Sequence, residues 1–159
     1  AYVQKKTGRD LVLWNGACMV HEIFSREKIT KLRERYPKAK LIAHPECEDV
    51  ILKMADYIGS TTGLLKYATK SIEKEFIVAT EAGILHQMQK DNQDKVFIPA
   101  PPNNNCACND CPHMKRNTLE KLYLCIKNEM PEITVPQHII ERAVKPIERM
   151  LEISARLGL

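Results

Sequence analysis

The chain has 159 residues, of which 44% are apolar and 6% aromatic, with a formal net charge of +4. This length suits one domain, with or without a helical tail. No apolar run approaches the roughly 20 residues of a membrane span and no signal-peptide pattern is present, so we expect a cytoplasmic protein that does not enter a membrane. Lysines and arginines alternate with acids, which is typical of solvated helix faces and argues against a nucleic-acid partner.

Short apolar runs alternate with amphipathic stretches along the first hundred residues. We predict strands at 10–14, 40–43, 57–59, 75–79 and 95–99. The stretches between them predict helices at 23–36, 50–55, 64–69 and 84–90. Because the connections are short, the most economical fold is α/β, with a parallel sheet of about four to five strands flanked by helices in three layers.

Reactive side chains follow the ends of these strands. They are Cys18, His44, Glu46, Ser60, Thr61 and Glu81. In a parallel sheet the residues after each strand line one edge, which is where ligands bind. We therefore expect separate segments of the chain to converge on one site at this edge.

Two further helices are predicted at 118–128 and 136–157, the second with a break or kink at Pro146. Two cysteines, Cys47 and Cys125, fall on predicted helices, and we expect both to be structural.

Three cysteines, Cys106, Cys108 and Cys111, lie on a segment whose prolines and asparagines predict a loop. A total of six cysteines without a secretory signal indicates metal or redox chemistry rather than a disulfide scaffold. Zinc, an iron-sulfur cluster and a reversible disulfide would each use thiolates gathered in this way. The spacing C-x-C-x2-C does not choose among them.

Two of the strand ends also carry groups suited to catalysis or anion binding. The pair His44 and Glu46, separated by one proline, could transfer protons, or could simply begin a helix. The run Ser60-Thr61-Thr62-Gly63 offers hydroxyls and amides to an anion, or a plain helix cap. For Glu81 we favour a cap of the following helix.

Five motifs together resemble the quinolinate synthase family (quinolinate synthase A). They are W-x-G-x-C-x-V-H at 14–21, H-P-E-C at 44–47, G-S-T-T-G at 59–63, A-T-E-A-G at 79–83 and C-P-H-M-K-R-N-T at 111–118. Each is weak alone, but their order and separations fit the carboxy-terminal half of that family. Ala79 stands where the family pattern leads us to expect glycine.

The resemblance implies an iron-sulfur transferase that condenses iminoaspartate with dihydroxyacetone phosphate to form quinolinate in de novo NAD biosynthesis. It implies a 4Fe-4S cluster held by one cysteine from each of three similar domains, with Cys18 and Cys111 as two ligands. It further implies that Glu46 and His44 are catalytic and bind substrate. Ser60 and Thr61 would bind carboxylate or phosphate.

The resemblance also places His21 and Met114 near the cluster or pocket, and the third cluster cysteine in an amino-terminal part that this sequence does not contain. Residues 1–18 would then be the tail end of a middle domain, 19–111 a carboxy-terminal α/β domain with the cysteine loop, and 112–159 terminal helices. We expect such a partial chain to be inactive alone. The pathway neighbour would be an aspartate oxidase or dehydrogenase, which supplies iminoaspartate.

Two rival readings use the cysteine loop alone. One is a small zinc-binding module built on Cys106, Cys108, Cys111 and His113. The other is a thiol redox protein that uses the C-x2-C pair Cys108 and Cys111. The zinc module leaves His44, Glu46 and the Ser-Thr-Thr run unexplained. The redox protein would need Cys108 near a helix amino terminus, whereas residues 103–105 predict a loop.

Overall fold

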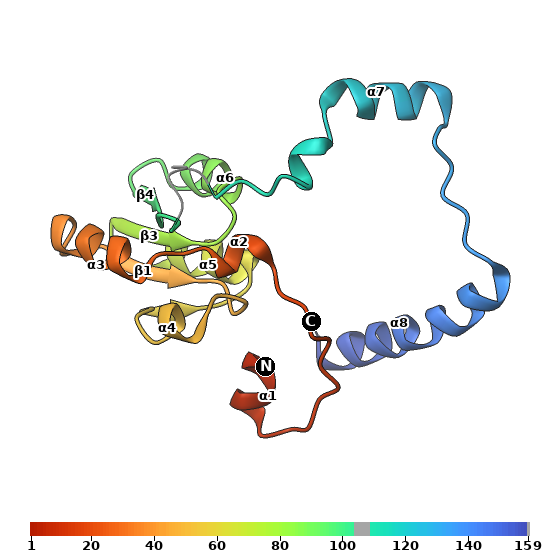
Figure 1. Cartoon of the computed structure of the whole chain (residues 1–159), viewed down its shortest axis with the longest axis horizontal. Coiled ribbons are helices and arrows are strands. Elements are labelled where there is room, and N and C mark those ends of the chain that lie inside the picture. The colour runs from red at the N-terminus through yellow and green to blue at the C-terminus, as the bar shows by residue number, and fades with distance from the viewer. Residues whose placement is uncertain (104–108, 159) are drawn as a thin grey trace. The chain divides into compact units, whose positions relative to one another are not determined.

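The computed structural model of the chain describes residues 1–103 and 109–158, in two units, Ala1–Arg116 and Asn117–Leu159. Figure 1 shows the elements of the first unit. Its helices are α1 (Tyr2–Thr7), α2 (Met19–Glu22), α3 (Arg26–Arg35), α4 (Asp49–Leu52), α5 (Thr61–Lys70), α6 (Ile84–Asp91) and the 3-10 turn η1 (Met114–Arg116). Its strands are β1 (Lys40–Ala43), β2 (Tyr57–Ile58), β3 (Glu75–Ala79) and β4 (Val96–Pro99).

The four strands form one sheet in the order β2-β1-β3-β4, and every neighbouring pair is parallel. Residues 40–43 of β1 lie opposite residues 76–79 of β3, so these two central strands end at the same level. The predicted parallel α/β sheet is thereby confirmed. Four of the five predicted strands are confirmed with it, and their carboxyl ends share one edge.

Alternate side chains of the central strands point to opposite faces of the sheet, as a period of two requires. On one face, Leu41 and Ile77 pack with residues of α3 and α4. On the other face, Ile42 and Phe76 pack with residues of α5 and α6. The unit is therefore a three-layer structure in which helices cover both faces of the sheet (Figure 1).

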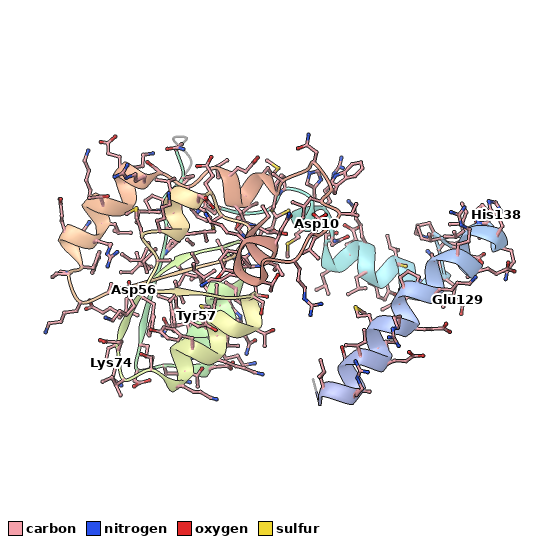
Figure 2. All side chains as sticks on the ribbon, turned by 90° about the horizontal axis from the view of Figure 1, so that it is seen from below. Asp10, Asp56, Tyr57, Lys74, Glu129 and His138 are labelled. Carbon is pink, nitrogen blue, oxygen red and sulfur yellow. The ribbon has the colours of Figure 1, made fainter. Side chains whose placement is uncertain are left out.

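Asp56 closes the edge of the sheet beside β2, next to Tyr57 (Figure 2). Its carboxylate accepts a hydrogen bond from the Leu41 amide at 2.7 Å and lies 3.4 Å from an Arg33 guanidinium nitrogen. The same arginine donates to the Met54 carbonyl at 2.9 Å. These contacts tie α3 to the loop that leads into the edge strand.

The chain leaving β4 returns to the junction between α2 and α3. The Ser25 amide donates to the Pro101 carbonyl at 3.0 Å, and the Asn103 amide donates to the Ile23 carbonyl at 2.6 Å. Phe24, which is fully buried, forms an antiparallel bridge with Pro102 between these two bonds. The segment that carries α2 is therefore fixed beside the carboxyl end of the sheet.

The predicted strand at 10–14 is wrong. These residues form neither helix nor strand, and Val12 and Trp14 are 107% and 90% exposed. An apolar run becomes a strand only when a neighbouring strand supplies its hydrogen bonds and burial. Within the described residues, 10–14 has no such neighbour.

The second unit consists of α7 (Leu119–Asn128) and α8 (Gln137–Leu157), close to the two predicted helices. The Thr118 hydroxyl caps α7 by accepting from the Lys121 amide at 3.2 Å. Of the predicted break or kink at Pro146, the break is wrong, because α8 runs through this residue, and the kink stays a prediction. Among the described helices, none is both long and apolar enough to cross a bilayer.

Lys95, just before β4, is buried and donates from its Nζ to carbonyls at the end of α5. The acceptors are Ala68 at 2.5 Å, Ser71 at 2.7 Å and Thr69 at 3.5 Å. The last carbonyls of a helix have no partner within the helix, and a cation there also complements the helix dipole. Lys95 thus joins α5 to the start of β4.

We expect Lys95→Met to lower the free energy of unfolding by about 2 to 3 kcal/mol, because buried carbonyls lose a charged donor. Urea denaturation of this variant and of Lys90→Met, at an exposed position on α6, measures the effect. Equal unfolding free energies for the two variants would show that the ammonium group of Lys95 does not contribute to stability.

Candidate functional site at the carboxyl edge of the sheet

Cys18 and His21 are brought together by α2, a single turn of helix. Cys18 is the residue before the helix, and its carbonyl accepts from the amides of His21 at 2.9 Å and Glu22 at 3.2 Å. His21 is 7% exposed. Its Nε2 lies 3.1 Å from the hydroxyl of Thr80, the residue directly after β3, so the ring is fixed against the carboxyl end of the central strand.

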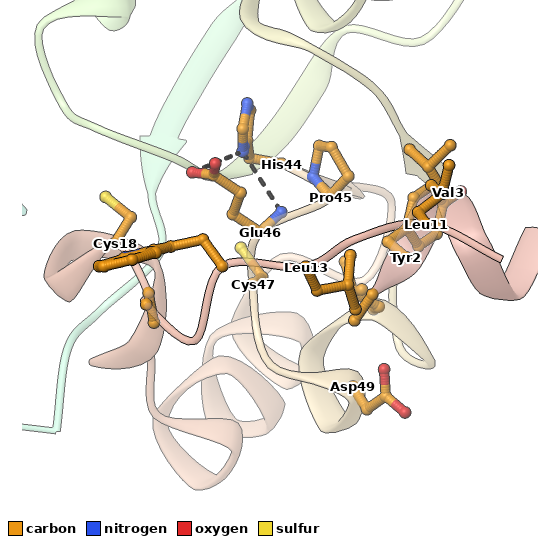
Figure 3. A pocket seen from close by; sticks show the side chains of 15 residues that line it. Tyr2, Val3, Leu11, Leu13, Cys18, His44, Pro45, Glu46, Cys47 and Asp49 are labelled. Atoms are coloured by element: carbon orange, nitrogen blue, oxygen red, sulfur yellow. Dashed lines mark hydrogen bonds and ion pairs between the residues drawn. The ribbon is translucent and has the colours of Figure 1, made fainter.

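His44 and Glu46 follow β1 and meet the same histidine. The Glu46 carboxylate lies 3.1 Å from His21 Nδ1, and the ring of His44 stacks on that of His21 with centroids 4.4 Å apart. The Glu46 amide donates to His44 Nδ1 at 3.4 Å. Figure 3 shows the Glu46 carboxylate beside the His44 ring. One carboxylate and two imidazoles thus form a single contact group.

Burial lowers the pKa of His21, and the neighbouring Glu46 carboxylate only partly offsets this. Burial also lowers the pKa of His44, helped by the adjacent His21. Both pKa values therefore lie below the ordinary 6.5, which favours the neutral form of both rings at pH 7. A neutral imidazole has one donor and one acceptor nitrogen, which suits it to orient a substrate, pass a proton or bind a metal.

Cys18 completes the group. Its sulfur, one His21 nitrogen and one Glu46 oxygen all lie within 4.8 Å of one another. Sulfur, imidazole nitrogen and carboxylate oxygen are the donors that proteins offer to transition metals. The described residues therefore present a set of side chains that could bind a metal next to an acid-base pair.

This group borders a hollow of about 840 Å³ at the edge of the sheet (Figure 3). Its polar wall is formed by Cys18, His44 and Glu46, and apolar side chains of the amino-terminal segment line much of the rest. The side chain of Glu46 is 59% exposed. The carboxylate can therefore reach a molecule in the hollow while His21 holds it in place.

Cys111 is connected to the same strand end by Glu81. The Glu81 carboxylate accepts from the Cys111 amide at 3.2 Å and from the Gly83 amide at 2.7 Å. Glu81 directly follows Thr80, the partner of His21. Two adjacent residues after β3 therefore contact both cysteine-bearing segments. The bond to Gly83 lies in the turn before α6, and among the described residues no side chain caps that helix, so the expected role of Glu81 as a cap stays a prediction.

Cys47 differs from these two cysteines. It was predicted on a helix, but it lies in a bend before α4, because the helix begins only at Asp49. Its thiol is buried and donates to the Ala79 carbonyl at 3.3 Å. Burial raises the pKa of Cys47 to about 12. A thiol that resists deprotonation in this way packs like a small apolar residue and is a poor metal ligand.

The remaining predicted residues lie apart from this contact group. Ser60 caps α5 by accepting from the Gly63 amide at 3.2 Å, Thr61 is the first residue of that helix, and both are exposed. Met114 begins η1 and is exposed. None of the three lines the hollow. Cys125 lies on α7 as predicted, whereas Cys106 and Cys108, and with them both rival readings, fall outside the described residues.

The sequence did not reveal two residues that support the site. Thr80 holds His21, and Asn109, which is 1% exposed, donates to the Ala100 carbonyl at 2.5 Å. Thr80 could have been found, because it is a polar residue directly after a buried strand in the A-T-E-A-G motif. Asn109 gives no such signal, because it lies among other asparagines of the loop.

Comparisons with known proteins all point to one family. The model of a family described as quinolinate synthetase A protein matches residues 1–152. A quinolinate synthase from Gloeothece citriformis is 64% identical over 153 residues, which cover 96% of this chain and 47% of that protein. The corresponding protein from Microcystis aeruginosa is 62% identical over 153 residues, covering 96% and 48%. The protein from Chloroherpeton thalassium is 57% identical over 154 residues, covering 96% and 48%. The chain spans about half the length of the curated relatives it matches.

Proposed function

Because this chain belongs to the quinolinate synthetase A family, we propose that it is the carboxy-terminal half of a quinolinate synthase. The whole enzyme would condense iminoaspartate with dihydroxyacetone phosphate and release phosphate and water, giving quinolinate for de novo NAD biosynthesis. One observation carries the proposal: the Glu46 carboxylate lies 3.1 Å from His21, beside a hollow that Glu46 and Cys18 both line. The site thus combines a proton-transfer group with a thiol ligand.

The two proposed cluster ligands fit a 4Fe-4S cluster in their chemistry. Within the described residues, Cys18 and Cys111 are free, partly exposed thiols, unlike the buried Cys47. Both segments are attached to the end of β3, through Thr80 and Glu81. The third ligand would come from the amino-terminal half. When bound, the cluster would supply a Lewis acid through the iron that three cysteines leave without a protein ligand.

Glu46 would be the general acid and base. Its exposed carboxylate would take a proton from carbon during enolisation and return one to a leaving hydroxyl during dehydration. His21 would hold the carboxylate through the contact at 3.1 Å, and the ring of His44 stacks on that of His21. Being neutral, His44 could also orient a substrate carbonyl or carboxylate. His21 would form the wall nearest the cluster.

Ser60 and Thr61 would bind the anionic end of a substrate. Both lie at the amino terminus of α5, where the direction of the backbone amides and the positive end of the helix dipole favour carboxylate or phosphate. The strand before them, β2, pairs with β1, so this helix start and Glu46 belong to neighbouring strand ends. We propose that Met114 borders the pocket in the complete enzyme.

The division of the chain follows from the same proposal. Residues 1–18 would be the tail end of the middle domain, 19–111 the carboxy-terminal α/β domain and 112–159 its terminal helices. The relatives are about twice as long, and residues 11–14 leave four apolar side chains exposed, which supports a partner segment within the whole enzyme. The enzyme would act in the cytoplasm and take iminoaspartate from an aspartate oxidase or dehydrogenase.

We expect the full-length protein to form quinolinate under anaerobic conditions and the 159-residue chain alone to form none, because the chain lacks the third ligand and the rest of the pocket. Chromatographic detection of quinolinate after incubation with both substrates measures this. Turnover by the isolated chain at the rate of the full-length protein would overturn the partial-chain proposal. Absence of quinolinate with the full-length protein would overturn the assigned reaction.

A further inference from the structure

Glu81 links two segments that are 30 residues apart in the sequence. One carboxylate oxygen accepts from the Gly83 amide at 2.7 Å, inside its own turn. The other oxygen accepts from the Cys111 amide at 3.2 Å. A carboxylate that accepts hydrogen bonds from two backbone amides is held in one orientation. Each hydrogen bond to the charged group is also stronger than a hydrogen bond between neutral groups.

In a second hydrogen bond between the same two segments, the donor lies in the turn after β3 and the acceptor in the segment of Cys111. The Ala82 amide donates to the Asn109 carbonyl at 3.2 Å, and the buried Asn109 side chain donates to the Ala100 carbonyl at 2.5 Å. The segment 109–111 is therefore attached both to the turn after β3 and to the chain after β4. Glu81 contributes the bond on the Cys111 amide itself.

The absence of a side chain at Gly83 is a second indication that the position of the Glu81 carboxylate matters. Its φ and ψ are −60° and −27°, which any residue adopts, so the backbone does not require glycine. A Cβ at this position would lie only 2.7 Å from the Glu81 carboxylate oxygen. Within the described residues, the space that the missing Cβ leaves is the space the carboxylate occupies. Glycine here leaves room for the orientation that reaches Cys111.

We propose that Glu81 is a positioning residue that fixes the backbone of the cluster ligand Cys111, and that Gly83 is needed to keep the Glu81 carboxylate in place. The cluster in this statement rests on the proposed function, whereas the contact itself does not. Thr80, the preceding residue, holds His21. The turn after β3 therefore holds the Cys111 backbone through Glu81. It also holds the His21 ring, which lies beside the other proposed ligand, Cys18, through Thr80.

The test compares Glu81→Ala, Gly83→Ala and the double variant in the full-length protein, reduced and freed of metal. Hydrogen exchange at the Cys111 amide is followed by NMR after labelling with ¹⁵N-cysteine. We expect each single variant to speed this exchange about tenfold, because the amide loses a charged acceptor. The double variant should exchange no faster than Glu81→Ala, because the added methyl group meets only the Glu81 side chain. Asp110→Asn is the control, since that neighbouring carboxylate pairs with Lys115 instead.

Two results would overturn the proposal. One is unchanged Cys111 exchange in Gly83→Ala, which keeps every polar side chain and therefore does not depend on whether Glu81→Ala folds. The other is a double variant in which the two effects add in full. A second measurement uses reconstituted protein, from which an iron chelator should remove iron about tenfold faster in both single variants than in Asp110→Asn. A wild-type protein that holds no cluster would contradict the proposed function, but the exchange rates would still decide the role of Glu81.

Discussion

Replacing Glu46 with glutamine in the full-length protein is expected to lower kcat for quinolinate formation by about a hundredfold to ten-thousandfold, the range that general acid-base groups contribute. Glutamine keeps the size of the side chain and one acceptor oxygen for His21, which lies 3.1 Å from the carboxylate, but it cannot carry a proton between steps. Iron content should not change, because Glu46 is not one of the proposed ligands. Steady-state kinetics beside iron analysis separates these two effects.

The control is Glu48→Gln, an exposed carboxylate two residues along the same segment, just before α4. It should have wild-type kcat. A Glu46→Gln protein with nearly wild-type kcat would remove Glu46 from the chemistry. Loss of both kcat and iron would instead assign Glu46 to the metal site, alongside Cys18 and His21, whose ligand atoms lie within 4.8 Å of it.

Replacing Cys18 with alanine is expected to remove the cluster and reduce quinolinate formation below detection, and Cys111→Ala should do the same. Each variant leaves two thiolates for a cluster that family resemblance gives three, and a coordinate bond to iron has no substitute in a methyl group. The measurement is the visible spectrum and the iron content after anaerobic reconstitution.

Two other cysteines provide controls for this experiment. Cys125→Ala, in α7, should keep the brown colour and the activity. Cys47→Ala should also keep the cluster, although it removes a buried thiol and its bond to the Ala79 carbonyl, so the protein should be less stable. A Cys18→Ala protein that remains brown and active would refute the assignment of Cys18 as a ligand.

Sequence patterns were sufficient for the sheet because β1 and β3 are short apolar runs with helices on both sides, and burial on two faces follows from that composition. The same reasoning failed at 10–14. That run is equally apolar, but a strand needs a partner that its own sequence does not specify. A break at Pro146 also failed as a prediction, since α8 continues on both sides of this residue, although a proline removes one helix hydrogen bond.

The site could be predicted only in part. Parallel strands place the residues after β1 and β3 at one edge, so the approach of His44 and Glu46 to that edge followed from topology. The partners within the edge did not follow. Thr80 contacts His21, which is 59 residues away in the sequence, and Glu81 contacts Cys111, which is 30 residues away. Such contacts depend on side-chain orientations that no local sequence pattern encodes.

We propose above all that Cys18 and Cys111 act together in one iron-sulfur site of a larger enzyme. The most direct measurement is the iron and acid-labile sulfide content of the anaerobically purified full-length protein, read with its visible spectrum. We predict a brown protein with about four irons and four sulfides per chain, the composition of a 4Fe-4S cluster. A colourless protein that carries tightly bound zinc, unchanged by Cys18→Ala, would contradict it.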